Sequence, residues 1–264
     1  MSLATAAIAV GFALDLTFGE LPNAAHPVAW FGYLVDRFDR VWSRPLAAGL
    51  TLAAGLPVFV ATATGIIVAA IAAMHPWLGA GVGGVVVFVT TSFRSLLATV
   101  RRVGRLAERD LAAARSALGA LAGREAAGLD AGRVRSAAVE SLAENLSDGL
   151  VAPLLAFGVC AGVGTVVGLA PPSVLALACA GAAWLKAVDT LDSMWGYPDR
   201  PLGTGAARLD DLAMWLPARI TAALLAVAMA SPRSLHRATR PGRATRAPDG
   251  ASEAKPSPPQ ATPP

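Results

Sequence analysis

Three groups of carboxylates stand at the ends of apolar stretches, each with cations or amides nearby. Glu140, Glu144 and Asp148 recur every four residues, so on a helix they share one face. Like charges at this spacing repel by about 0.2–0.5 kcal/mol per pair, so the stripe is either a solvated face or the seat of a cation. The other polar members of the three groups are Asn145, Lys186, Asp189, Asp192, Ser193, Arg208, Asp210, Asp211 and Arg219.

These residue types indicate phosphate and metal chemistry. Mg²⁺ binds through one or two carboxylates together with substrate phosphates, and Lys and Arg bind phosphate or carboxylate groups. Neither a phosphate-binding loop nor a glycine-rich dinucleotide fingerprint occurs. The sequence therefore predicts ATP-linked acyl or phosphoryl transfer at a membrane surface. His26, in a Pro-flanked loop, is a further candidate, although a lone histidine fits a loop hydrogen bond better than a catalytic role.

Long uncharged segments predict an integral membrane protein. Only 15% of the 264 residues are charged, against about 25% in soluble domains. Pro45–Phe93 contains no Asp, Glu, Lys or Arg, which is enough for two spans of about 20 residues, with the turn expected at His75–Pro76. Gly149–Leu185 is equally uncharged. Either two spans divided at Ala170–Pro172 or one bent or re-entrant element fits its length.

The amino-terminal part mixes short apolar runs with turn residues. Leu3–Leu14 is apolar but too short to span comfortably. Glycine and prolines predict a loop over Phe18–Val28. Helical spacing returns over Trp30–Trp42. The apolar side of that predicted helix consists of Phe31, Leu34, Val35, Phe38 and Val41.

We therefore expect an all-α membrane domain over residues 1–230 with about five apolar helices. Its polar parts are a helical insert over 94–148 and a loop over 186–211. In the insert, one helical pattern runs from Leu96 to Leu118, and Asp130 is suited to cap a second helix. Leu212–Ala230 is expected to be the last apolar helix. The Pro- and Arg-rich tail, 231–264, is expected to be disordered.

Charge distribution excludes one class of function and sets a topology. The net charge of +4 comes from the tail, which holds six basic and two acidic residues. Without a basic aromatic patch elsewhere, nucleic-acid binding is not expected. Cys160 and Cys179 lie in apolar runs and fit packing rather than a disulfide framework. The basic segments 37–44 and 94–135 and the basic tail predict that the polar face is cytoplasmic, in a multi-pass protein of the cell membrane.

Four motifs occur in the order HPVAWFG, VESLAENLSDGLVAPLL, KAVDTLDSMWGY and RLDDLAMWLPARI. Together they resemble the CobD/CbiB family of cobalamin biosynthesis over residues 10–230. The resemblance implies an adenosylcobinamide-phosphate synthase, a membrane enzyme that uses ATP and Mg²⁺. Such enzymes join the propionate carboxylate of adenosylcobyric acid to the amine of aminopropanol phosphate. Where the family continues with an SPNAG-like segment and another apolar helix, this chain has its Pro/Arg-rich tail, so the usual carboxy-terminal segment is expected to be missing.

The resemblance also suggests roles for the polar groups. Glu144 and Asp148 would help to hold Mg²⁺, with Asp192 and either Asp210 or Asp211 completing the site. The expected phosphate-binding cations are Lys186, Arg208 and Arg219. The expected catalytic set is His26, Glu140, Glu144, Asn145, Asp189, Asp192 and Ser193. The expected partners are the corrinoid, the amino-alcohol phosphate, membrane lipid and other enzymes of the pathway.

Two other functions compete with the enzyme. A non-catalytic scaffold or degenerate paralogue of the cobalamin pathway would share the motifs and the membrane domain but would lack turnover. A transporter or channel would need ionisable residues in mid-span. Pro45–Phe93 and Gly149–Leu185 have no Asp, Glu, Lys or Arg, which argues against transport.

Overall fold

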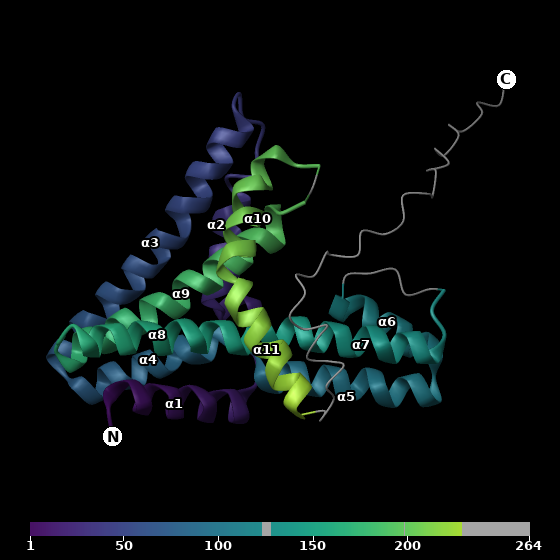
Figure 1. Ribbon diagram of the computed structural model, residues 1–264, viewed down its shortest axis with the longest axis horizontal. Helices are drawn as coiled ribbons and strands as arrows, with labels where there is room; N and C mark the ends of the chain where they lie inside the picture. Colours follow the sequence, from purple (N-terminus) through teal and green to yellow (C-terminus); the bar gives the residue numbers. More distant parts are fainter. Residues whose placement is uncertain (123–127, 198, 229–264) are drawn as a thin grey trace.

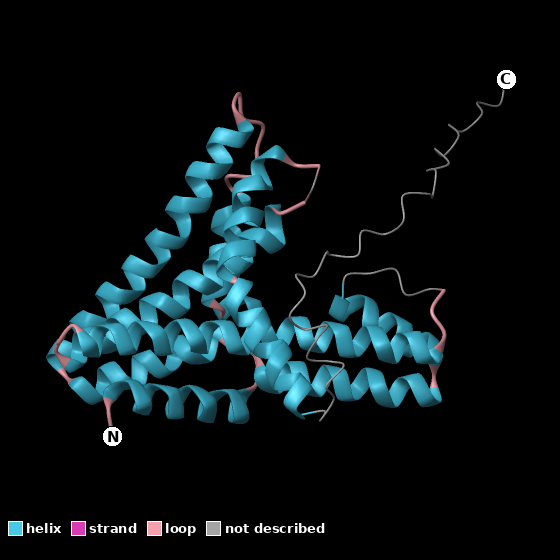
Figure 2. Cartoon of the chain, viewed as in Figure 1, coloured by secondary structure: helices cyan, strands magenta, loops and turns pink. Residues whose placement is uncertain are grey.

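The computed structural model describes residues 1–122, 128–197 and 199–228, and these residues form helices and loops without a strand (Figure 2). The all-α prediction is confirmed. The tail 231–264 lies outside the described residues. The helices are α1 (Leu3–Phe18), α2 (Pro27–Asp36), α3 (Pro45–Met74), α4 (Pro76–Thr90), α5 (Phe93–Arg109), α6 (Leu111–Ala122), α7 (Ala131–Leu146), α8 (Ala152–Val166), α9 (Pro171–Trp195), α10 (Thr204–Ala213) and α11 (Trp215–Ala228). Three shorter turns are η1 (Asn23–Ala25), η2 (Ser147–Val151) and η3 (Pro201–Gly203).

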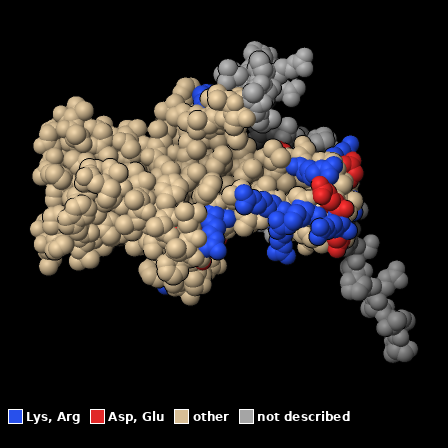
Figure 3. Space-filling view, turned by 90° about the horizontal axis from the view of Figure 1, so that it is seen from below, with Lys and Arg blue, Asp and Glu red and all other residues tan. Residues whose placement is uncertain are grey.

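The helices form an apolar bundle and a polar arm. In Figure 1, α1, α4 and α8 run along one direction, and α5, α6 and α7 extend beyond the bundle on the opposite side from the α3–α4 turn. In the bundle, α9 packs against α3 and α8, and α1 packs against α4. On the face seen in Figure 3, the charged side chains gather toward the arm, whereas the half with the α3–α4 turn is free of them.

Four helical stretches are long and apolar enough to cross a membrane. Their bounds are Pro45–Met74, Pro76–Arg109, Ala131–Val166 and Pro171–Trp195. A fifth is reached if α10 and α11, which meet at 47°, count as one broken span. The expected turn at His75–Pro76 is confirmed, and Gly149–Leu185 is divided into two helical stretches by a turn at 167–170, as the two-span alternative requires. In the second turn, Gly168 has a φ of +77°, which glycine adopts without steric cost.

Small residues let the bundle helices approach closely, as is common between helices in membranes. A Cβ on Gly11 of α1 would lie 2.6 Å from Cγ1 of Val87 in α4, so only glycine allows this approach. The core where α1, α4, α8 and α9 meet is built mainly from alanine, together with a few valines and leucines, Cys179 and one large ring, Phe157. Of the four candidate spans in the described residues, α3 is the least buried, which leaves most of its apolar length open to lipid.

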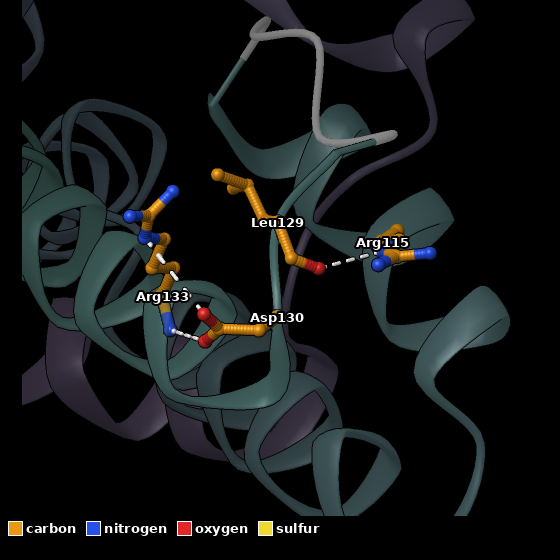
Figure 4. A network of polar contacts seen from close by, with 4 residues as sticks. All are labelled: Arg115, Leu129, Asp130 and Arg133. Carbon is orange, nitrogen blue, oxygen red and sulfur yellow. Dashed lines mark hydrogen bonds and ion pairs between the residues drawn. The ribbon is translucent and has the colours of Figure 1, made fainter.

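The polar arm is a three-helix bundle with its own core. Helix α5 is amphipathic and buries Leu96, Val103 and Ala107 against its neighbours. As expected, Asp130 caps α7, since its Oδ1 accepts the Arg133 N–H at 2.8 Å. Arg115 of α6 donates to the Leu129 carbonyl at 2.7 Å and ties the loop before α7 to α6 (Figure 4).

Four expected element boundaries were wrong. The loop expected over 186–211 is a loop only in its middle, because α9 continues to Trp195 and α10 begins at Thr204. The helix expected over Trp30–Trp42 is α2, which begins at Pro27 and ends at Asp36, and Val41 is fully exposed beyond it. After α2 the chain turns toward the loop that follows α9, where Asp39 pairs with Arg200.

The other two differences have causes in single residues. The continuous pattern from Leu96 to Leu118 breaks at Asp110, whose carboxylate accepts the Ala113 N–H and starts α6. The helix expected over Leu212–Ala230 is split at Met214. Pro217 causes this split, because proline cannot donate to the carbonyl four residues earlier and its ring clashes there.

Candidate active site

A pocket of about 360 Å³ opens where the bundle meets the polar arm. Its polar lining comes from the α1–α2 loop with Glu20, Asn23 and His26, and from α9 with Lys186 and Thr190. The end of α4 closes another side. A volume of this size lies at the lower end of the range for small-molecule sites. We call it the inner pocket.

His26 lies in the inner pocket because it caps α2. Pro27 starts the helix, and His26 Nδ1 accepts the N–H of Val28 at 3.2 Å. Burial, with a smaller contribution from Lys186, lowers the pKa of His26 below its usual 6.5, although Glu20 opposes this shift. The neutral imidazole therefore uses Nδ1 as an acceptor and carries its proton on Nε2, where it can only donate.

Lys186 is held by an ion pair on its own helix. Its Nζ lies 2.7 Å from Oδ2 of Asp189, one turn along α9, and both side chains are mostly buried. This pair keeps the ammonium group at the inner pocket, which Lys186 lines. Asp189 and Asp192 lie on neighbouring turns of α9, as the spacing predicted.

The predicted carboxylate stripe does not continue regularly to Asp148. Glu140 and Glu144 lie on α7, but Asp148 lies in η2, a π-helical turn that joins α7 to α8. The wider turn moves Asp148 away from the line of the two glutamates. The chain also makes a close contact here, since Ser92 N–H donates to the Gly149 carbonyl at 2.9 Å. A Cβ on Gly149 would lie 2.6 Å from Ser92 Oγ.

The carboxylates of three elements meet near this turn. Asp210 of α10 lies within electrostatic range of Asp148, Asp189 and Asp192, and also of Asp211. Oδ1 of Asp192 and Oδ1 of Asp210 are buried without a hydrogen-bond partner among the described residues. A buried acceptor without a donor is costly, so such oxygens indicate a cation, water or ligand group in the functional state.

A second pocket of about 740 Å³ lies beside the first, between α5, α6 and α7. Glu20 and Ser92 line both pockets. Asn145 lines the second pocket and donates to the Ser141 carbonyl at 2.8 Å. Arg102 and Ser116 add a cation and a hydroxyl to this lining. We call it the arm pocket.

Several predicted site residues lie on the surface, away from the lining of either pocket. Arg219 stacks on the Trp215 ring, with its guanidinium carbon 3.9 Å from the ring centre, and donates to the Trp215 carbonyl. Its donors are thus partly used within α11. The exposed members of the predicted set are Glu140, Glu144, Ser193, Arg208 and Asp211.

Other polar residues were not singled out from the sequence. Glu20 accepts a hydrogen bond from Ser95 Oγ at 2.8 Å on the wall shared by the pockets. Asp15 is buried at the end of α1 and caps α5 by accepting the Arg94 N–H at 3.0 Å. Arg94 in turn donates to the carbonyls of Leu16 and Thr17. The sequence signal for Asp15 was its position directly after the apolar run Leu3–Leu14, where a carboxylate is able to cap a neighbouring helix.

The arrangement fits a phosphate-bound magnesium ion better than a metal cage. Within residues 1–122, 128–197 and 199–228, no group of three or more His, Cys, Asp or Glu side chains could hold a metal ion. Mg²⁺, however, commonly uses one or two carboxylates and completes its shell with substrate phosphates and water. The unpartnered oxygens of Asp192 and Asp210 suit that mode.

Comparison with known proteins gives a consistent result. The family model described as "CobD/Cbib protein" matches residues 8–257. Cobalamin biosynthesis protein CobD of Rhodobacter capsulatus is 36% identical, over 92% of this chain and 76% of that protein. Cobalamin biosynthesis protein CbiB of Salmonella choleraesuis is 36% identical, over 83% of this chain and 67% of that protein. CobD of Clostridium perfringens is 32% identical over the same shares. No solved structure matches the chain.

Proposed function

Because this chain belongs to the CobD/CbiB family, we propose that it acts in cobalamin biosynthesis as an adenosylcobinamide-phosphate synthase. The reaction joins the propionate carboxylate of adenosylcobyric acid to the amine of an amino-alcohol phosphate, with ATP as the source of energy. The observation that carries this proposal is the inner pocket, which the Lys186 and His26 side chains both line. Further along α9, outside the pocket lining, Asp192 has a buried oxygen without a hydrogen-bond partner among the described residues, as does Asp210 of α10.

The size of the inner pocket favours the small substrate. About 360 Å³ accommodates an amino-alcohol phosphate, whereas a corrinoid ring is too large to be enclosed. Lys186 provides a charged donor for the phosphate, and His26 Nε2–H adds a neutral donor. The ion pair with Asp189 fixes the direction of the Lys186 side chain before the substrate arrives. The corrinoid is then bound at an open surface, with only its reacting side chain reaching inward.

The carboxylates of Asp192 and Asp210 would hold Mg²⁺, with Asp148 nearby. When bound, Mg²⁺ neutralises negative charge on ATP phosphates and helps to orient them. Glu144 and Asp211 are exposed and lie at the edge of this group, where they add negative charge. Arg208 and Arg219 remain proposed phosphate contacts at the surface.

We propose that the reaction takes place at the cytoplasmic surface of the membrane. The inner pocket and the arm pocket lie at the end of α4 opposite the α3–α4 turn, where the chain leads directly into the arginine-rich helix α5. Basic segments favour the cytoplasmic side, so we propose that the active face is cytoplasmic, where ATP is supplied. The apolar surface of α3 then faces lipid.

The test is synthesis by the purified full chain in lipid vesicles, together with rescue of a strain that lacks the synthase. Asp192→Asn and Asp210→Asn are each expected to reduce turnover about 10²–10³-fold, the usual effect of removing a positioned electrostatic group. Asp199→Asn, an exposed acid in the neighbouring loop, is the matched control. Binding of corrinoid without ADP release or amide product would instead identify a scaffold. Near-normal turnover in both the Asp192→Asn and Asp210→Asn variants would contradict the proposed role of these carboxylates in holding Mg²⁺.

A further inference from the structure

Glu20 lies at the junction of the two pockets. It follows α1 and lines both the inner pocket and the arm pocket, a position that it shares with Ser92. Ser95 Oγ donates to Glu20 Oε2 at 2.8 Å, and no hydrogen bond to a described residue occupies Oε1. A carboxylate on this shared wall can reach groups bound on either side of it.

Among the inner-pocket residues, Glu20 is the side chain suited to accept a proton. Lys186 is an ammonium group paired with Asp189, so it has no free lone pair. His26 uses its Nδ1 lone pair to accept the Val28 N–H, and its Nε2 carries the proton. Glu20, by contrast, is exposed to the pocket and has an oxygen available.

The proposed reaction needs such an acceptor. A primary amine, like the side chain of lysine with a pKa of about 10.4, is protonated near neutral pH and cannot attack in that form. We propose that Glu20 is the general base that removes the first proton from the substrate amine, an inference that rests on the proposed function. The amine would lie in the inner pocket and the activated carboxyl group in the arm pocket, with Glu20 between them.

The step balances with the substrates already named. ATP transfers its terminal phosphoryl group to the carboxylate, which gives an acyl phosphate and ADP. The neutral amine nitrogen then forms a bond to the acyl carbon, and the bond from that carbon to the phosphate oxygen breaks. The phosphate leaves with the bonding electrons and takes the second amine proton. Glu20 passes the first proton to solvent.

The experiment compares two nucleophiles in the Glu20→Gln variant, which keeps an acceptor for Ser95. With the amino-alcohol phosphate, amide formation is expected to fall about 10²–10⁴-fold, the usual contribution of a general base. Hydroxylamine is already neutral at pH 7, so hydroxamate formation from the acyl phosphate is expected to stay unchanged. Raising the pH is expected to restore amide formation, because it deprotonates the amine without the enzyme.

Glu108→Gln is the matched control, since Glu108 is an exposed acid on α5 that lines neither pocket. Glu20→Asp keeps a carboxylate and is expected to recover part of the amide activity. Equal loss with both nucleophiles would assign Glu20 a structural role, and undiminished amide formation would remove it from catalysis. If the wild-type protein releases no ADP and forms no acyl phosphate with its substrates, the proposed function itself is wrong and the inference falls with it.

Discussion

Two histidines cap helices near opposite ends of α4: His75 caps α4 itself, and His26 caps α2. His26 and His75 each precede a proline that starts a helix, and each accepts a backbone N–H at 3.2 Å through Nδ1. His75 begins α4, whereas His26 lies in the pocket at the far end of that helix. Fifteen helical residues separate the two sites, or about 22 Å at 1.5 Å per residue.

Their surroundings differ. His75 is exposed in a stretch without Asp, Glu, Lys or Arg from residue 45 to 93. His26 is partly buried, with Glu20 and Lys186 close enough to act on its charge. The His-Pro pair therefore specifies a cap at both ends. The difference lies in the neighbouring residues. Glu20 and Lys186, which come from distant parts of the chain, make the cap at His26 part of a candidate active site.

For the comparison of the two histidine sites, the largest expected effect follows from removing the cation beside His26. Lys186→Met is expected to raise the KM for the amino-alcohol phosphate about 10–100-fold, since a hydrogen bond to a charged group contributes about 1.5–3 kcal/mol. Steady-state kinetics in vesicles measure this change. The double variant Lys186→Met with Asp189→Asn also removes the Asp189 charge, which Lys186→Met alone would leave without its partner. Lys186→Arg keeps the positive charge and is the control. An unchanged KM in the double variant would contradict the role of Lys186.

Alanine at the two histidines separates capping from function. Both His26→Ala and His75→Ala are expected to lower the free energy of unfolding by about 1 kcal/mol, the usual value of an N-cap. Only His26→Ala is expected to reduce kcat/KM as well, by roughly fivefold, because a neutral hydrogen bond contributes about 1 kcal/mol. Thermal unfolding and kinetics on the same samples check both parts.

Asparagine sharpens this comparison, because it is a good N-cap but lacks the Nε2–H donor. His26→Asn is expected to restore stability and to leave kcat/KM low, whereas His75→Asn should match the wild-type protein in both. If His75→Ala reduced kcat/KM as much as His26→Ala, the loss would come from helix capping alone, and His26 would have no separate role in the inner pocket.

The smallest effect is a pH dependence of stability at His26. Its pKa in the folded protein is lowered from 6.5, chiefly by burial, so the folded state binds its proton less readily than the unfolded state. Its stabilising contribution is fully present above pH 6.5 and is lost as the pH falls through the lowered value. Unfolding midpoints between pH 7.5 and 5 are expected to fall less in His26→Asn than in the wild-type protein. Parallel curves would contradict this.

Local signals predicted much of the fold. The charge-free runs predicted the spans, His75–Pro76 predicted their turn, and Asp130 predicted the start of α7. Each of these signals acts within one or two helical turns of the residue that carries it. Val41 shows the limit, because continued helical spacing did not reveal that α2 ends at Asp36.

The candidate site depended on contacts between distant segments. The regular spacing of Glu140, Glu144 and Asp148 assumed one α-helix, but η2 inserts a wider turn before α8. Glu20 belongs to no motif in the sequence, and its position follows from the break between α4 and α5 near Ser92. Spacing along the chain therefore identified polar groups, while their mutual arrangement required the folded structure.

The contact between Asp15 and Arg94 also has a consequence for the order of assembly. These residues are 79 positions apart, and ribosomes add about 5–20 residues per second, so Arg94 follows Asp15 by on the order of ten seconds. Helix α4, on which α1 packs, is also made later. During that interval α1 remains in the membrane interface without its final partners, and the nascent chain depends on lipid or on insertion machinery to shield it.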